Sequence, residues 1–159
     1  MLFRSNVVNL SGGSTLSASV STMVGSNGGF NAFTATNAFV FGGLTIGLGS
    51  SNNTASVLGN VTWDFRGNLL KFGTGTGNVL TVAEFATQNT ILTNIGGVVI
   101  ADANRSLFIT NVTGNRNMIL GVGGSISVGD AAGWGNNTLS ISNQNFTTTA
   151  AGLVGNGSS

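Results

Sequence analysis

Residues 96–111 read GGVVIADANRSLFITN, and residues 123–143 read GGSISVGDAAGWGNNTLSISN. Both segments open with Gly-Gly and a short alternating apolar run, then pass through Asp-Ala and a polar linker. Both close with a second apolar run followed by Asn. Whether this is one structural unit written twice decides the fold, and the spacing of the matched residues tests it.

The matched apolar residues recur at a narrow range of spacings. The pair at 107–109 recurs at 139–141, an offset of 32, and an equivalent pair at 80–82 precedes it by an offset of 27. A second series, at 44–46, 70–72 and 98–100, shows offsets of 26 and 28. The spacing of successive units therefore ranges from 26 to 32, and an insertion near 132–135 accounts for the longest interval.

Each unit contains up to three short apolar runs, such as LLKF, VLTVA and TILTNI between residues 69 and 95. The 26 Gly and the many Asn, Ser and Thr disfavour helix, whereas Val, Ile, Thr and Phe suit strands. Val61, Trp63 and Phe65 alternate with polar residues, which predicts that they face a core. Three short strands in a turn of about 27 residues predict an all-β, right-handed parallel β-helix with three sides.

The corners of such a solenoid are expected to hold the Gly and Asn residues, which accept positive φ. Asn and Thr at equivalent corners are expected to form hydrogen-bonded ladders along the stack, and the absence of Pro fits strands that all need their N–H groups. The alternative architecture is an antiparallel β-sandwich or jelly roll, whose turns lie about 8 to 12 residues apart.

The repeat predicts solenoid coils over residues 42–159 and an irregular N-terminal segment over 1–41, either a cap or a ragged first coil. The opening MLFRS, residues 1–5, is equally consistent with a native start and with a translated sequencing-adapter end. We expect the chain to be a fragment of a longer repeat array that continues beyond both ends.

Composition excludes several classes of function. Only 6% of residues are charged, the net charge is +1 and no basic run exists, so we expect no nucleic-acid partner. The chain has no Cys and no His, which removes thiolate metal sites and the commonest general base. We therefore expect no cofactor and no catalytic residue. No stretch of about 20 apolar residues exists, so no membrane span is expected within this chain.

Three residues are candidates for a site. Asp102 and Asp130 occupy matching repeat positions, so in a β-helix they would lie one coil apart, about 4.8 Å along the stack. They would then form an acid pair or a calcium site, or they would be corner residues that face water. The corner interpretation is favoured. Trp134 stands between Gly133 and Gly135 in the insertion, where we expect it to protrude and contact a ligand.

Three segments resemble repeats of bacterial autotransporter passenger domains and related large adhesins: GNLLKFG at 67–73, GGSISVGDA at 123–131 and GNNTLSISNQN at 135–145. The resemblance covers about residues 42–155 through period and composition. The passenger repeat that ends in Thr-x-Thr-Val-x-x-Gly-Thr-Leu is not present in clean form, which leaves the subfamily open.

The resemblance implies an extracellular or cell-surface solenoid, anchored to the outer membrane through a part outside this chain. It implies a structural or adhesive role, with a host surface or a glycan as partner. One alternative is a viral or phage fibre or capsid protein. Another is a polysaccharide-lyase-like β-helix enzyme, for which Arg105 and Arg116 lie near Asp102. With so few charged side chains in the chain, a non-enzymatic protein is expected.

Overall fold

The computed structural model describes residues 5–84, 90–100, 106–111, 119–123, 126–128, 137–142, 147–148 and 152–154. This part of the chain is built from strands and contains no helix. The strands are β1 (Val7–Leu10), β2 (Ser14–Ser26), β3 (Ala32–Ala35), β4 (Ala38–Leu48), β5 (Thr54–Leu58), β6 (Val61–Asp64), β7 (Leu69–Phe72), β8 (Val79–Glu84), β9 (Thr90–Ile95), β10 (Gly97–Ile100), β11 (Ser106–Asn111), β12 (Ile119–Val122), β13 (Ile126–Val128), β14 (Thr138–Ser142), β15 (Thr147–Thr148) and β16 (Gly152–Val154).

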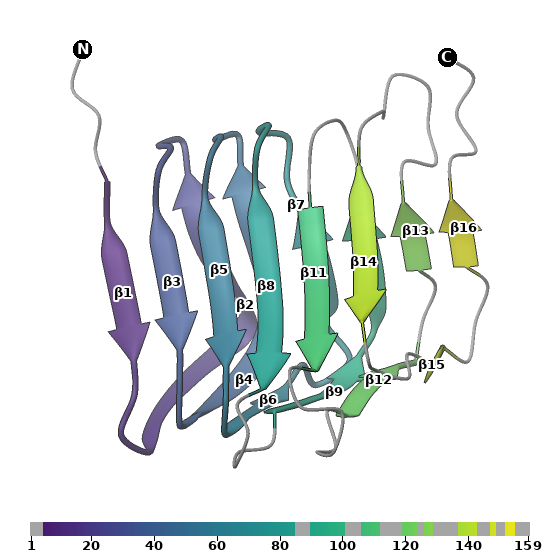
Figure 1. Ribbon diagram of the computed structural model, residues 1–159. Coiled ribbons are helices and arrows are strands. Elements are labelled where there is room, and N and C mark those ends of the chain that lie inside the picture. The colour runs from purple at the N-terminus through teal and green to yellow at the C-terminus, as the bar shows by residue number, and fades with distance from the viewer. Residues whose placement is uncertain are drawn as a thin grey trace.

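The strands stack as the coils of a right-handed solenoid with three faces (Figure 1). The first face is a six-stranded sheet in the order β1-β3-β5-β8-β11-β14. The second face contains the first part of β4 with β6, β9, β12 and β15, and the third contains the last part of β4 with β7, β10, β13 and β16. The predicted three-sided β-helix is confirmed.

All strand pairs in the described part of the chain are parallel. A parallel pair needs a crossover between its two strands, and here the other two faces of the coil supply it. The alternative prediction of an antiparallel sandwich or jelly roll is therefore wrong. The turn spacing expected of a sandwich also occurs in this chain, but only because each corner of a coil is itself a turn.

The register reproduces the spacings read from the sequence. Leu107 pairs with Leu80 on one side and with Leu139 on the other, which are the two partners expected from the first series of apolar pairs. On the third face Leu70 pairs with Leu44 and with Val98, as the second series predicts. Matched apolar residues of successive coils thus stand directly above one another, and those of the third face, Leu44, Leu70 and Val98, are buried in one continuous core.

Side chains that alternate along each strand build this core. Val61, Trp63 and Phe65 are fully buried, as their alternation predicts. The Trp63 ring stacks on Phe65 with 5.2 Å between centroids and meets Phe33 of the preceding coil edge-on at 5.9 Å. The indole N–H of Trp63 donates to the carbonyl oxygen of Gly42 at 2.7 Å, so the polar atom of this large side chain is satisfied inside the core.

The long strand β4 turns the corner between the second and third faces at Gly42, where φ is +99°. A Cβ atom at this position would lie 2.5 Å from the carbonyl oxygen of Ala18 in β2. β2 turns beside it with a register shift between Ser17 and Ser21. Gly42 is needed for both its backbone conformation and the close approach of the neighbouring coil.

Residues 7–41, for which the sequence predicts an irregular segment, a cap or a ragged coil, contain β1, β2, β3 and the start of β4. β1 pairs with β3, and β2 pairs with β4, in the same parallel arrangement as the later strands. Strands of the solenoid thus begin at Val7. Over the described ranges, no helix is long and apolar enough to cross a membrane.

Candidate functional site

The three site residues predicted from the sequence, Trp134, Asp102 and Asp130, lie outside the described residues. The strands that precede the two aspartates are described, and Ile100 of β10 pairs there with Val128 of β13. The repeat therefore holds its register up to the last described residue before each aspartate. The acid pair, the calcium site and the corner role stay predictions, as does the ligand contact of Trp134.

A carboxylate that the structure does describe, Asp64, acts as a corner residue between β6 and β7. Its Oδ1 accepts hydrogen bonds from the Asn94 side-chain amide of the next coil and from the backbone N–H of Arg66, both at 2.9 Å. The bond from Asn94, followed by that from Arg66, lowers the pKa of Asp64 because both stabilise the charged form. Within the described ranges no three His, Cys, Asp or Glu residues gather in a group that could hold a metal ion.

The most regular polar feature is a ladder of asparagines, Asn6, Asn31, Asn53 and Asn78, each directly before a strand of the first face. The Nδ2 of each of the first three donates to the Oδ1 of the next asparagine at 2.8 to 2.9 Å. The backbone N–H groups of the first three donate to the same oxygens. The predicted corner ladder is confirmed for asparagine.

The ladder lies deepest in its middle, where Asn53 and Asn78 are fully buried. Nδ2 of Asn53 also donates to Ser50 Oγ at 3.0 Å, and Nδ2 of Asn78 donates to the carbonyl oxygens of Gly75 and Ser50. Every buried polar atom of these two amides is thus hydrogen-bonded. The ladder fixes the height of one coil above the next, and it is a structural element rather than a binding site.

Sequence reasoning anticipated this ladder without naming its members. The available signal was an Asn immediately before the first apolar strand of a coil, at intervals of 25, 22 and 25. All three intervals are shorter than the repeat seen in the apolar residues, and Gly, Ser and Asn are frequent throughout this part of the chain. In such a background a regular spacing of one polar residue does not stand out.

A shallow hollow of about 260 Å³ lies on the third face and crosses β2, β4 and β7. Ser21 and Thr45 line it, with their hydroxyl oxygens 3.1 Å apart, and Val20, Leu69 and Lys71 also border it. Hydroxyl groups, one ammonium group and apolar edges are the groups with which proteins bind polar organic ligands such as sugars. This hollow is one candidate ligand site among the described residues.

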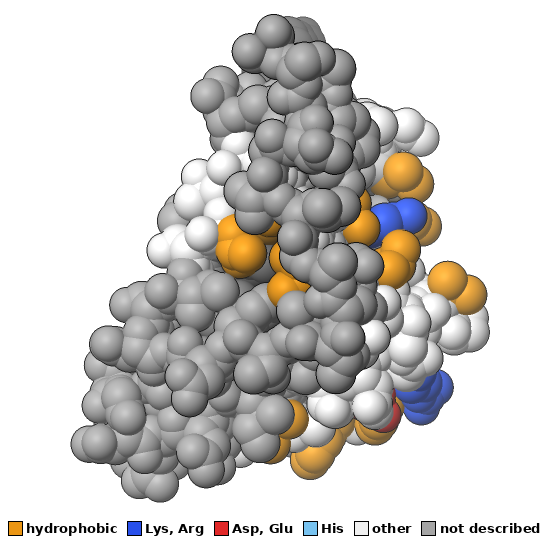
Figure 2. Space-filling view, turned by 90° about the vertical axis from the view of Figure 1, so that its right-hand side faces the viewer, with side chains coloured by type: hydrophobic (Ala, Val, Ile, Leu, Met, Phe, Trp, Pro, Cys, Tyr) orange, Lys and Arg blue, Asp and Glu red, His pale blue; other side chains and the backbone are white. Residues whose placement is uncertain are grey.

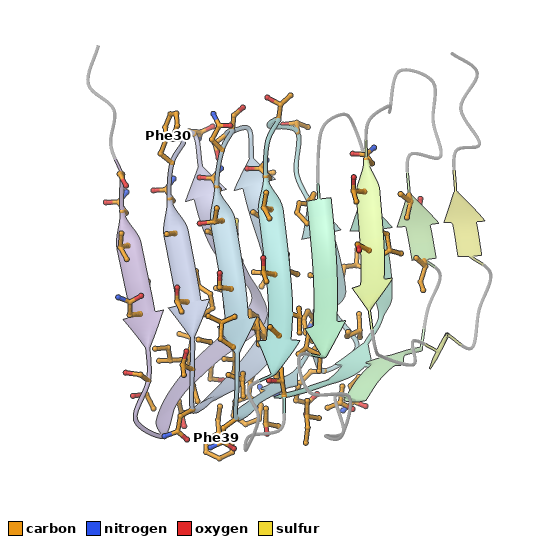
Figure 3. All side chains as sticks on the ribbon, viewed as in Figure 1. Phe30 and Phe39 are labelled. Atoms are coloured by element: carbon orange, nitrogen blue, oxygen red, sulfur yellow. The ribbon has the colours of Figure 1, made fainter. Side chains whose placement is uncertain are left out.

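Two exposed aromatic side chains, Phe30 and Phe39, point away from the stack at opposite corners (Figure 3). Phe30 has a φ of +61°, a conformation that is costly for a bulky side chain.

Figure 2 looks along the stack from the side of the C-terminal strands, and its described surface shows few charged side chains beside hydrophobic and uncharged polar ones. The described surface is thus weakly charged and offers isolated apolar contacts.

A comparison with protein-family models, curated proteins and solved structures gives no match for this chain.

Proposed function

We propose that the chain is a non-enzymatic structural and adhesive segment of an autotransporter-like protein, exposed outside the cell. The observation that carries the structural part is the parallel stacking of strands on three faces, which continues through the described residues. Each coil contacts its neighbours along the stack, and each adds about 4.8 Å to the length. Such a solenoid holds two parts of a longer protein at a fixed distance.

Its side chains support the same role. The buried row of Leu, Ile, Val and Phe runs through successive coils, and the asparagine ladder joins those coils at one corner. Neither feature presents a reactive group to solvent. Both resist bending and sliding of one coil over another.

The adhesive part of the proposal is supported by the resemblance to adhesin repeats and by the hollow that Ser21, Thr45 and Lys71 line. A host-surface glycan is the proposed partner. The test is binding of the purified chain to immobilised glycans and to host cells. We expect saturable binding. We also expect Lys71→Ala, Trp134→Ala, or both, to weaken this binding severalfold.

Phe39→Ala is the matched control, because Phe39 is an exposed aromatic residue outside the hollow. It should bind as the unchanged chain does. Loss only in Trp134→Ala would place the contact in the insertion, and loss only in Lys71→Ala would place it in the hollow. Absence of binding to any glycan or host cell would overturn the adhesive part.

The non-enzymatic part has its own test, because a lyase would need its acidic residues. Acidic polysaccharides incubated with the chain and calcium should stay uncleaved. Cleavage that disappears in Asp102→Asn and Asp130→Asn would show that the chain is an enzyme. Antibody labelling of intact cells that express the parent protein tests exposure, and labelling only after lysis would contradict it.

A further inference from the structure

Three successive coils line the hollow on the third face. Val20 and Ser21 come from β2, Thr45 comes from β4, and Leu69 and Lys71 come from β7. The hollow lies on the side of the solenoid, because β2 and β7 both pair with β4. Its volume of about 260 Å³ is slightly below that of pockets that take drug-sized ligands, so it has room for a single sugar unit.

The charge in this hollow has one sign. Among the described residues that line it, Lys71 carries the one charged group and none is a carboxylate. Asp64 lies outside the lining, and its Oδ1 accepts hydrogen bonds from Asn94 and Arg66. An ammonium group forms its strongest hydrogen bonds with an anion, so the hollow favours a ligand that carries negative charge.

Strand register sets the direction in which such a ligand extends. Lys71 stands in register between Thr45 of β4 and Val99 of β10. The side chain of Val99 has no polar atom, so the polar partner next to Lys71 is the hydroxyl group of Thr45. Neighbouring strands lie about 4.8 Å apart, a distance that two substituents of one sugar ring can bridge.

The hydroxyl protons of Ser21 and Thr45 are both used within the protein. Ser21 Oγ donates to the carbonyl oxygen of Thr22 at 3.2 Å, which takes its single proton. The 3.1 Å hydrogen bond between the two hydroxyl groups is therefore donated by Thr45. Both oxygens keep lone pairs, so this pair accepts hydrogen bonds from a ligand hydroxyl and has no proton to offer an anion.

We propose that the hollow binds an acidic sugar unit, with its carboxylate or sulfate group on the ammonium of Lys71 and a ring hydroxyl that donates to Thr45 Oγ1. Val20 and Leu69, which are 66% and 43% exposed, contact the apolar C–H face of the ring. A neutral sugar would leave the ammonium group without an anion, and an anion without hydroxyl groups would meet the lone pairs of Thr45. This inference rests on the proposed glycan binding and adds the class of sugar.

Matched ligands test the inference on the unchanged chain. Oligosaccharides of glucuronic, galacturonic and sialic acid are compared with their methyl esters, which keep every ring hydroxyl but lose the charge. Sulfated and unsulfated galactose oligosaccharides form a second arm. In calorimetric titrations at low salt, at least one acidic form should bind about threefold or more tighter than its neutral counterpart. High salt should reduce this preference, and the arm that shows it identifies the anionic group.

Variants of the chain then locate the contact. Lys71→Met should lower the affinity for the acidic form to that for the neutral form, and Lys71→Arg should keep the preference. Arg66→Met is the matched control, because it removes the same charge from an exposed residue outside the lining. It should leave the preference unchanged. Thr45→Val should weaken binding of both forms by the same factor, because both donate a hydroxyl proton to Thr45. Circular dichroism should show equal strand content in all of these chains.

The outcomes separate this inference from the proposed function. Equal binding of acidic and neutral forms by the unchanged chain would overturn the inference and leave glycan adhesion intact. A preference that survives Lys71→Met, or that Arg66→Met removes equally, would place the charge contact outside the hollow and overturn the inference too. Absence of binding to every glycan, acidic or neutral, would overturn both the inference and the adhesive part of the proposed function.

Discussion

At the scale of single residues, stability depends on a few polar side chains that serve two coils at once. Oδ1 of Asn53 accepts from the N–H and Nδ2 of Asn31, and its own Nδ2 donates to Asn78 and Ser50. No water reaches this fully buried side chain, so its partners have no substitute if it is removed. One amide thereby holds three successive coils together.

Asn53→Ala should lower the free energy of unfolding by about 2 to 4 kcal/mol, because several buried polar groups lose their partners together. Urea unfolding followed by circular dichroism measures this loss. Asn9→Ala is the control, since Asn9 is an exposed asparagine in β1 outside the ladder. It should change stability by less than about 0.5 kcal/mol. Equal losses in the two variants would contradict the structural role of the ladder.

Asp64 adds a pH-dependent contribution to the free energy of unfolding. Hydrogen bonds from Asn94 and Arg66 lower its folded pKa, whereas an unfolded Asp has a pKa of about 3.9. The unfolded chain therefore takes up the proton first as the pH falls. The contribution is complete above about pH 5 and is lost as the pH falls through the folded pKa.

The measurement compares the unchanged chain with Asp64→Asn in urea at about pH 6 and about pH 2.5. The advantage of the unchanged chain over the variant should be greater at the higher pH. The effect should be small, because the carboxylate is exposed to solvent. An advantage that is the same at both pH values, or larger in acid, would contradict the assigned hydrogen bonds.

At the scale of elements, the corners decide how closely coils approach. β4 crosses from the second face to the third without interruption, because Gly42 combines a positive φ with space for the carbonyl of Ala18. Gly67 also has a positive φ, of +76°, but nothing lies within 4 Å of where its Cβ would be. Alanine substitutions at these two glycines therefore separate the cost of backbone strain, which both share, from the cost of steric contact between coils, which only Gly42 has.

Gly67→Ala should cost about 1 kcal/mol, the strain of a side chain in the left-handed region. Gly42→Ala should cost about 2 kcal/mol more, because the added methyl group must push β2 away from β4. Urea unfolding of both variants measures the difference. If both glycines cost the same, the contact with Ala18 would not limit the approach of the coils.

The elements also show which parts of the fold the sequence could predict. Apolar pairs such as Leu80 and Leu107 could be matched because parallel register places equivalent residues above one another, so that spacing in the sequence equals pairing in space. The first coils escaped this search because their register offsets are shorter, as the pairing of Leu16 with Val40 shows. Their inward positions also include the small residues Ala35 and Ala55, which carry a weak apolar signal.

Site residues were harder to predict than strands, for a physical reason. A core position must be apolar and in phase with its neighbours, whereas a corner position accepts any residue that satisfies the local turn. Asp64 shows this, because its carboxylate is used by the turn at Arg66 and by Asn94 of the next coil. The same residue type at Asp102 and Asp130 is therefore compatible with a corner role as well as with a site.

At the scale of the whole molecule, each coil is stabilised by its pairing with the coils on either side. The inner strands β5, β6 and β7 have neighbours on both sides, whereas β1 and β2 have a neighbour on one side only among the described strands. In a linear stack the end unit gains half the interface of an inner one, so it opens first.

Hydrogen exchange followed by mass spectrometry should show this gradient. Amides of residues 7–26 should exchange about tenfold faster, or more, than those of residues 54–72. Uniform protection along the monomer would mean that the stack unfolds as a single unit.

The asparagine ladder has an electrical consequence as well as a mechanical one. All of its amide groups point the same way, with oxygen toward the N-terminal end and nitrogen toward the C-terminal end. Their dipoles add as those of successive peptide units do in a helix, which leaves partial negative charge at Asn6. Each amide also polarises the next, so a hydrogen bond in the interior is strengthened from both sides. Removing Asn31 or Asn53 should therefore weaken the remaining bonds of the row more than removing Asn6.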